Sequence, residues 1–244
     1  MRRWFTFYST VVCLILASHS WAQTVVYPCA NPRNNFSFEL SMNPAFFIEC
    51  GYHRRIADIA GKPVLIHATL GSPLFLLKEF DSFRFGLGGS VKWIEQGRFD
   101  LFGGLFTSVA TNESVNGKFV AWNLMLTVLP GYYYKNWFTA LELAWKPTMA
   151  THITHSGYAK AAFDNRYPDS TPPDKMTKGH KDGWYSTPAN RIMGGLMGGY
   201  TIGQSYTIYL KGGINYTPNK FNIFMFGDIG VIPYYVNLGV IRHW

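Results

Sequence analysis

The chain has 244 residues, a formal net charge of +8, 17% aromatic residues, 24 glycines and only 15% charged residues. This composition is unlike that of a soluble α/β enzyme. After residue 22 no apolar run is long enough for a membrane-spanning helix. Abundant aromatic residues and glycines with weak overall hydropathy are typical of a transmembrane β-barrel, in which only alternate residues meet lipid.

Residues 1–22 have the features of a Sec-type signal peptide. Two arginines precede an apolar run, and Ser20-Trp-Ala22 places small residues before a cleavage point. We expect cleavage near Ala22, and the loss of the two arginines lowers the net charge from +8 to +6. Residues 23–35 are rich in proline and asparagine and are expected to form an irregular N-terminal lead-in segment.

From residue 36 the chain alternates between apolar and polar side chains, which is the period of a β-strand. In the first segment Phe36, Phe38 and Leu40 share one face, with Ser37 and Glu39 on the other. Short polar or glycine-containing segments separate the next strands, as turns do. The first five predicted strands cover residues 36–42, 46–56, 63–77, 82–95 and 98–110.

The second half of the chain continues the same alternation, with one long interruption. Strands are predicted at 118–129 and 137–148, with the aromatic cluster Tyr132-Tyr-Tyr134 between them at the level of a membrane interface. Residues 154–188 lack apolar alternation and carry four prolines, so we expect a long loop. The last three predicted strands cover residues 189–202, 206–216 and 234–244.

These segments predict an all-β fold, a single transmembrane antiparallel up-and-down β-barrel of about ten strands over residues 36–244, within a range of eight to twelve. The turns near 57–62, 96–97, 131–135 and 203–205 then lie in the periplasm with both chain ends, and the long loop 154–188 lies outside the cell. A secreted soluble β-protein is the alternative fold, but it does not account for apolar outward faces on nearly every strand.

The face opposite the apolar one predicts a polar lumen. The inward-facing residues are Glu39, Glu49, His53, Arg84, Lys92, Asp100, Glu142, Lys146 and Lys211. Charges inside a barrel are expected to pair, because an unpaired charge away from water is costly. About eight strands leave an interior that side chains just fill, so about ten predict a plugged or narrow interior. A selective small-solute pore is the alternative.

Two cysteines remain after Cys13 leaves with the signal peptide. Cys29 and Cys50 form an even pair in an oxidising compartment, which favours a disulfide, with two free thiols as the alternative. The sequence contains no zinc-type Cys/His spacing, no phosphate-binding glycine loop and no basic aromatic groove. We therefore expect no metal, no cofactor and no nucleic-acid partner.

The closing segment 234–244 alternates apolar side chains and ends on Trp244. Together with the earlier strands, it resembles the small outer-membrane β-barrel proteins of Gram-negative bacteria. The resemblance implies location in the outer membrane, contact with its lipids and lipopolysaccharide, and insertion by the barrel-assembly machinery through the closing strand. Cations in or beside the long loop are expected at the level of the lipopolysaccharide: Lys160, Arg166, Lys175, Lys178, Lys181 and Arg191.

One cluster has the residue types of a catalytic site, His152-Ile-Thr-His-Ser-Gly157 at the start of the long loop. It resembles the His-x-Ser-Asn-Ala-Gly motif of the outer-membrane lipid A deacylases, in which the His and Ser form a triad with a later Glu. The resemblance implies that His152 is the base, that Thr154 stands in the place of the Ser nucleophile, and that Asp164 substitutes for the Glu.

His155 and Ser156 are the alternative pair in this cluster, although they depart from the family motif. Strand parity counted from Trp137 predicts that His152 and Thr154 face the lumen, where a lipid substrate does not reach them; a bulge at Pro147 would reverse this. The favoured function is therefore a non-enzymatic outer-membrane barrel whose long extracellular loop does structural, adhesive or ligand- and solute-related work. An outer-leaflet lipid-modifying hydrolase, deacylase-like or phospholipase-like, is the alternative.

Overall fold

The computed structural model describes residues 33–42, 46–73, 83–114, 117–160, 182–186, 189–216 and 234–244. The predicted signal peptide and most of the predicted lead-in segment lie outside these residues, as do Cys29 and Asp164. In the part of the chain that is described, no helix is both long enough and apolar enough to cross a membrane.

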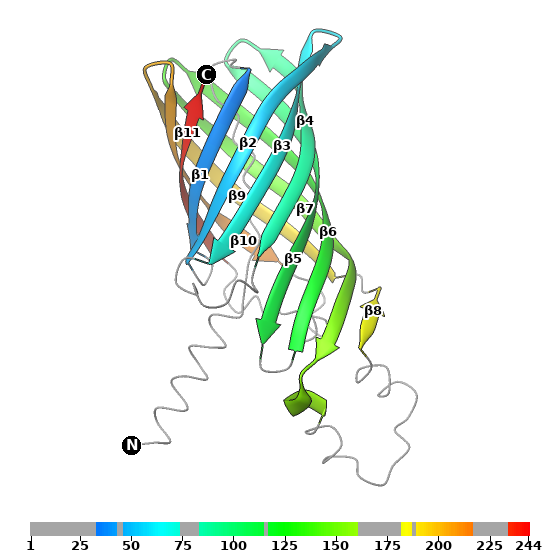
Figure 1. Cartoon of the computed structure of the whole chain (residues 1–244). Coiled ribbons are helices and arrows are strands. Elements are labelled where there is room, and N and C mark those ends of the chain that lie inside the picture. The colour runs from blue at the N-terminus through cyan, green and yellow to red at the C-terminus, as the bar shows by residue number, and fades with distance from the viewer. Residues whose placement is uncertain are drawn as a thin grey trace, which may run out of the picture.

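Ten long antiparallel strands form a closed barrel (Figure 1), which confirms the predicted fold. The barrel strands are β1 (Asn34–Met42), β2 (Phe46–Ile59), β3 (Lys62–Pro73), β4 (Arg84–Gln96), β5 (Phe99–Ser114), β6 (Gly117–Tyr134), β7 (Trp137–His155), β9 (Ala189–Ile202), β10 (Tyr206–Tyr216) and β11 (Tyr234–His243). Consecutive strands pair around the wall, and β1 closes it on β11 from Asn35↔His243 to Met42↔Val236.

The two ends of the barrel differ. At one end, which we call the turn end, β2–β3, β4–β5, β6–β7 and β9–β10 are joined by tight turns beside the C-terminus (Figure 1). Gly97 and Gly203 have φ of 63° and 61° there, a conformation that glycine adopts without a steric penalty. Asn34 and Trp244 exchange two backbone hydrogen bonds at this end, of 3.2 and 3.1 Å. The opposite end is the loop end.

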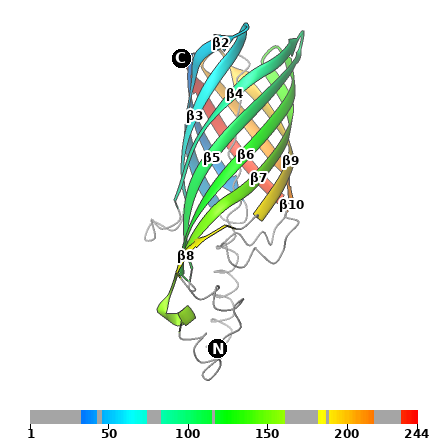
Figure 2. The ribbon, with the colours of Figure 1, turned by 90° about the vertical axis from the view of Figure 1, so that its right-hand side faces the viewer.

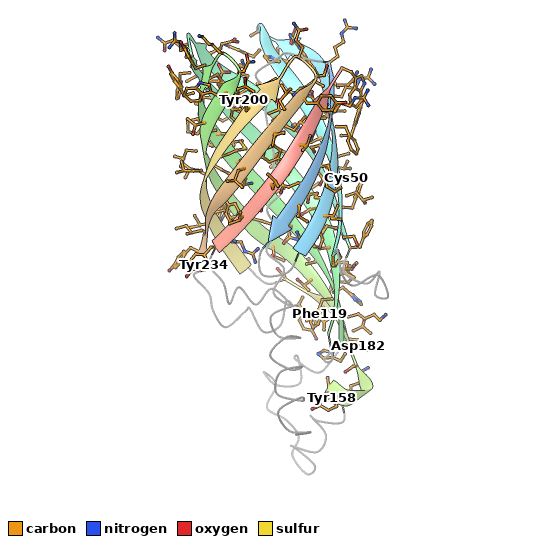
Figure 3. The ribbon with its side chains drawn as sticks, turned by 90° about the vertical axis from the view of Figure 1, so that its left-hand side faces the viewer. Cys50, Phe119, Tyr158, Asp182, Tyr200 and Tyr234 are labelled. Carbon is orange, nitrogen blue, oxygen red and sulfur yellow. The ribbon has the colours of Figure 1, made fainter. Side chains whose placement is uncertain are left out.

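The outer face of the wall is apolar and ends in aromatic residues. On β10, Ile208, Leu210 and Ile214 are exposed between Tyr206 and Tyr216. Ten residues of strand at about 3.4 Å each, tilted by about 40°, span roughly 26 Å along the barrel axis. Tyr200 and Tyr234 lie near opposite ends of the barrel in Figure 3. An apolar band of this height flanked by aromatic rings has the dimensions of the lipid-facing band of a transmembrane barrel, about 25 Å.

Three strands continue past the loop end. There β5, β6 and β7 project beyond the barrel, and the short strand β8 (Gly183–Tyr185) joins them by pairing with β7 (Figure 2). A helical turn at residues 157–160 follows β7. We call residues 111–114, 117–121, 150–160 and 182–185 the extension. The sequence predicted neither β8 nor the helical turn, because three or four residues are too few to show a period.

A β-bulge at Met149 changes which side chains of β7 face outward. Thr148 pairs with Asn123 of β6, but Ala150 pairs with Trp122, so Met149 is an extra residue on β7. An extra residue reverses the alternation beyond it. Thr151 and Ile153 are consequently buried, with 0% and 1% exposure.

His152 and Thr154 therefore lie on the outer face of the extension. The prediction that they face the lumen is wrong, because the parity count from Trp137 assumed an unbroken strand. Pro147, two residues before the bulge, leaves a gap in the ladder with β6, since proline has no N–H to donate.

Gly195 and Gly194 of β9 provide a matched test of lumen packing. A Cβ at Gly195 would overlap the Tyr235 hydroxyl and lie 2.9 Å from the Gly212 carbonyl oxygen, whereas a Cβ at Gly194 has no neighbour within 4 Å. Gly195→Ala is expected to lower the free energy of unfolding by about 1–3 kcal/mol through overpacking. Gly194→Ala is expected to leave it unchanged. Urea unfolding, followed by the gel mobility shift between folded and boiled protein, measures both, and equal stability of the two variants would contradict this packing.

Candidate functional site

The lumen contains all nine polar residues that the alternation placed there. Seven of them are buried, with exposures of 1–6%: Glu39, Glu49, His53, Arg84, Glu142, Lys146 and Lys211. Lys92 and Asp100 are half-buried near the turn end, where the Lys92 ammonium lies 2.9 Å from Asp100 and 3.3 Å from Glu95. Apolar side chains fill the remaining space beside them: Leu65, Phe102, Phe106, Met125, Leu129, Phe138, Met193, Met197 and Ile241.

Two buried carboxylates organise the middle of the lumen. Glu39 accepts hydrogen bonds from the Tyr209 hydroxyl at 2.6 Å and from the Asn237 amide at 2.5 Å.

Glu142 accepts from the Lys211 ammonium at 2.8 Å and from the Tyr235 hydroxyl at 2.8 Å. Lys211 and Glu142 are each 1% exposed, and they come from β10 and β7, with β9 between them. Side chains from nearby strands thus meet inside the barrel, and the carboxylates obtain the charge-assisted hydrogen bonds that a buried charge requires.

The sequence analysis did not single out Tyr209, Tyr235 or Asn237. Tyr209 lies on the same face of β10 as Lys211, and Tyr235 and Asn237 lie on the polar face of β11. The alternation of the sequence therefore indicated that all three face the lumen. The predicted lumen set contained only charged residues and His53, so the hydroxyl and amide donors to the carboxylates were left out of it.

A chain of four polar side chains lies in the wall from β1 to β4. The Ser37 hydroxyl lies 2.9 Å from His53 Nε2, His53 Nδ1 lies 2.5 Å from His67 Nδ1, and His67 Nε2 lies 2.6 Å from the Ser90 hydroxyl. A hydrogen bond between two Nδ1 atoms needs one ring to donate and the other to accept. The two imidazoles therefore share one proton at that contact, and His67, which the sequence analysis did not list, is as buried as His53.

Cationic side chains gather inside the barrel toward the loop end. The Arg84 guanidinium stacks over the Phe47 ring at 3.7 Å, and Lys146 and Arg191 occupy paired positions on β7 and β9. Arg191 is only 8% exposed. The predicted strand at 189–202 is present, but the Arg191 side chain is buried inside the barrel, so the expectation that it lies at the lipopolysaccharide level is wrong.

On the extension, Asp182 connects the two ends of the chain segment between β7 and β8. Its carboxylate accepts hydrogen bonds from the Lys160 ammonium at 2.8 Å, from the His155 backbone N–H at 2.8 Å and from His155 Nδ1 at 3.0 Å. The Lys160 ammonium, and after it the two His155 donors, hold the pKa of the Asp182 carboxyl well below its usual range. Asp182 is therefore the carboxylate that contacts a histidine of the 152–157 cluster.

The other members of the sequence cluster lie nearby with different contacts. The Ser156 hydroxyl accepts from the Ala159 N–H at 3.1 Å and caps the helical turn. The His152 ring packs edge-on against Trp184 at 5.2 Å between centroids. Thr154 is exposed on the same face as His152. Within the described residues, no hydrogen bond joins His152 to Thr154 or to Asp182.

Cys50 lies on the outer side of β2 (Figure 3) and forms no disulfide with another described residue. Its predicted partner Cys29 lies outside the described residues, so the disulfide stays a prediction. No group of three or more His, Cys, Asp or Glu side chains placed to hold a metal ion occurs in the described ranges.

Comparisons with known proteins give structural similarities at low sequence identity. No protein-family model and no curated protein matches the chain. The KdgM porin has a TM-score of 0.37 at 6% identity, covering 86% of this chain and 99% of that one. Outer membrane phospholipase A from Escherichia coli has a TM-score of 0.37 at 10% identity, covering 87% and 93%. BamA from Haemophilus ducreyi has a TM-score of 0.37 at 12% identity, covering 78% of this chain and 35% of that one.

Replacing one member of the Glu142–Lys211 pair is expected to be more destabilising than replacing both. Lys211→Met leaves a buried carboxylate without its cation, which is expected to lower the free energy of unfolding by about 3–5 kcal/mol. Combining it with Glu142→Gln removes both charges and is expected to recover most of that loss. Urea unfolding in lipid vesicles measures the three proteins. A double variant no more stable than Lys211→Met would contradict the pairing.

Proposed function

We propose that this chain is a non-enzymatic outer-membrane β-barrel with a closed interior, whose work is done by the extension outside the cell. The apolar band flanked by aromatic rings supports placement in a membrane, since only closed barrels and helices satisfy every backbone group in hydrocarbon. Outer-membrane barrels have short periplasmic turns and longer outer loops, which supports a periplasmic turn end and an external loop end.

The filled lumen is the observation that carries the closed-barrel proposal. The hydrogen bonds from Tyr209 to Glu39 and from Lys211 and Tyr235 to Glu142 join nearby strands inside it. Tyr209 and Tyr235 are 2% and 1% exposed, so water has little access to either ring. A ten-stranded wall leaves little room beyond such side chains, and a wide diffusion pore is therefore not the proposed function.

The extension supports an external binding or adhesive role. It projects past the loop end and presents the aromatic side chains Tyr158 and Trp184, which are 67% and 65% exposed. Asp182 joins β7, the helical turn and the start of β8 through Lys160 and His155, so the base of the long segment has a defined position. Exposed aromatic rings on a fixed support are typical anchors for a partner.

Conductance in planar bilayers tests the closed lumen. The protein is expected to give no stable channels of porin size, and Tyr209→Ala with Tyr235→Ala is expected to produce them by removing two buried rings from the lumen. Tyr200→Ala, on the outer face, is the matched control and is expected to stay closed. Stable channels of the same size in the unaltered protein and in the double variant would refute the closed interior.

A second candidate function is an outer-leaflet lipid hydrolase, and the bulge at Met149 is the observation that favours it. The bulge turns His152 and Thr154 to the outer face, where a lipid would meet them. In this reading His152 takes the proton from the Thr154 hydroxyl as it attacks an ester carbonyl, and Asp182 is the neighbouring carboxylate. The absence of a His152–Thr154 hydrogen bond in the described residues places this function second.

Mass spectrometry of lipid A and phospholipids, from cells with and without the protein, separates the two functions. The non-enzymatic proposal expects unchanged acyl chains. A hydrolase would remove one acyl chain, and His152→Ala would abolish that loss whereas Lys118→Ala, on the same face of β6, would not. His155→Ala is included because His155 is the histidine that contacts a carboxylate. Loss of a chain that depends on either histidine would overturn the non-enzymatic proposal.

A further inference from the structure

Five side chains at the turn end form a compact group on the outer surface. The Arg98 guanidinium lies 4.2 Å over the Tyr134 ring and donates a hydrogen bond of 3.1 Å to the Tyr132 hydroxyl. The Lys135 ammonium lies 5.4 Å from the same Tyr134 ring. Trp137 contacts both tyrosines, at 6.1 and 5.9 Å between ring centroids. We call these five residues the Arg98 cluster.

The sequence builds the Arg98 cluster from two adjacent turns. Phe99 pairs with Tyr132, and the Tyr133 N–H donates to the Arg98 carbonyl at 2.7 Å, so the β4–β5 turn lies beside the end of β6. Tyr132 and Tyr134 share a face because they are two residues apart on a strand. Lys135 has a φ of 51°, which makes the sharp reversal into β7 and leaves its side chain exposed.

The two cations of the Arg98 cluster differ from Arg55 and Lys92 at the same end. Arg55 is bound to Asp58 at 2.7 Å, and Lys92 is bound to Asp100 at 2.9 Å. No carboxylate among the described residues forms an ion pair with Arg98 or Lys135, whose contacts are with aromatic rings. The cluster therefore presents two positive charges on an aromatic surface, and of the five Arg98 N–H donors one makes a hydrogen bond within the described residues.

The position of the Arg98 cluster identifies what surrounds it. Tyr132 and Trp137 are 39% and 44% exposed and belong to the aromatic ring at the turn-end edge of the apolar band. Amphipathic rings at such an edge lie at the level of lipid head groups. With the turn end in the periplasm, as proposed above, these head groups are those of the inner leaflet of the outer membrane.

We infer that the Arg98 cluster is a binding site for the phosphate group of an acidic membrane phospholipid. The inference rests on the membrane placement proposed above. The guanidinium, held flat by Tyr134 and fixed by Tyr132, offers paired N–H donors to phosphate oxygens. Lys135 supplies the second positive charge, and the rings of Tyr132 and Trp137 contact the glycerol and the upper acyl chains.

Native mass spectrometry of the folded, delipidated protein in detergent tests this site by titration with phosphatidylglycerol. Phosphatidylcholine, which has a phosphate but no net charge, and inorganic phosphate, which has no acyl chains, are the comparison ligands. Phosphatidylglycerol is expected to bind most tightly. Arg98→Ala is expected to weaken its binding about fivefold and Arg98→Ala with Lys135→Ala about 25-fold, at about fivefold for each basic residue.

Two further variants separate a defined site from general charge. Arg55→Ala removes a cation at the same end that is already paired with Asp58, and it is expected to bind phosphatidylglycerol as the unaltered protein does. Arg98→Lys keeps the charge but loses the stacked guanidinium, and it is expected to lie between Arg98→Ala and the unaltered protein. The gel mobility shift on boiling confirms that each variant is folded.

Several outcomes would overturn the inference. Equal loss of binding in Arg98→Ala and Arg55→Ala would show attraction by general charge only. Inorganic phosphate binding as tightly as the lipid would assign the site to a soluble anion. Variants that slow assembly in cells but bind phosphatidylglycerol normally would assign the cluster to a protein partner. If the unaltered protein does not insert into vesicles, the proposed membrane placement fails. If it folds and inserts but all variants bind phosphatidylglycerol equally, the membrane placement stands and only the lipid site fails.

Discussion

Closure of the backbone ladder between β1 and β11 is the constraint on which the rest of the structure depends. In hydrocarbon an unpaired N–H or C=O group costs several kcal/mol, so a sheet that crosses a membrane must leave no free edge. The pairing from Asn35↔His243 to Met42↔Val236 removes the last edge. Once the wall is closed, alternation assigns each residue to lipid or to lumen, and ten strands fix how narrow that lumen is.

The narrow lumen explains why its polar residues form linked groups. A charge that cannot reach water needs a partner within hydrogen-bond distance, and strands one to three places away along the wall are close enough to supply one. Glu142 on β7 meets Lys211 on β10 and Tyr235 on β11. Glycines make the room for these rings, since a Cβ at Gly195 would overlap the Tyr235 hydroxyl. The many glycines, the buried aromatic rings and the paired buried charges thus all follow from the small circumference of the barrel.

Period-two alternation made the ten strands, the lumen face and the position of the turns predictable from the sequence, because each follows from side-chain parity alone. Features that depend on a local change of register could not be predicted. The bulge at Met149 leaves no composition signal, and it reverses His152 and Thr154. Strand β8 is too short to show a period. Arg191 was misplaced because it stands at the border between a polar segment and a strand, where a charge is compatible with either.

The same parity argument decides how the two candidate functions stand. Without the bulge, His152 would face the lumen, away from lipid, and its resemblance to a deacylase histidine would have no consequence for a lipid substrate. One extra residue moves His152 onto the outer face beside Trp184. An outward orientation is not sufficient for catalysis, because a general base must lie within reach of the proton that it abstracts. In the described contacts the carboxylate of Asp182 binds His155 and not His152. The extension therefore has the exposure that a lipid-facing or partner-facing surface needs, and the hydrogen bonds that define it act to position a segment of chain.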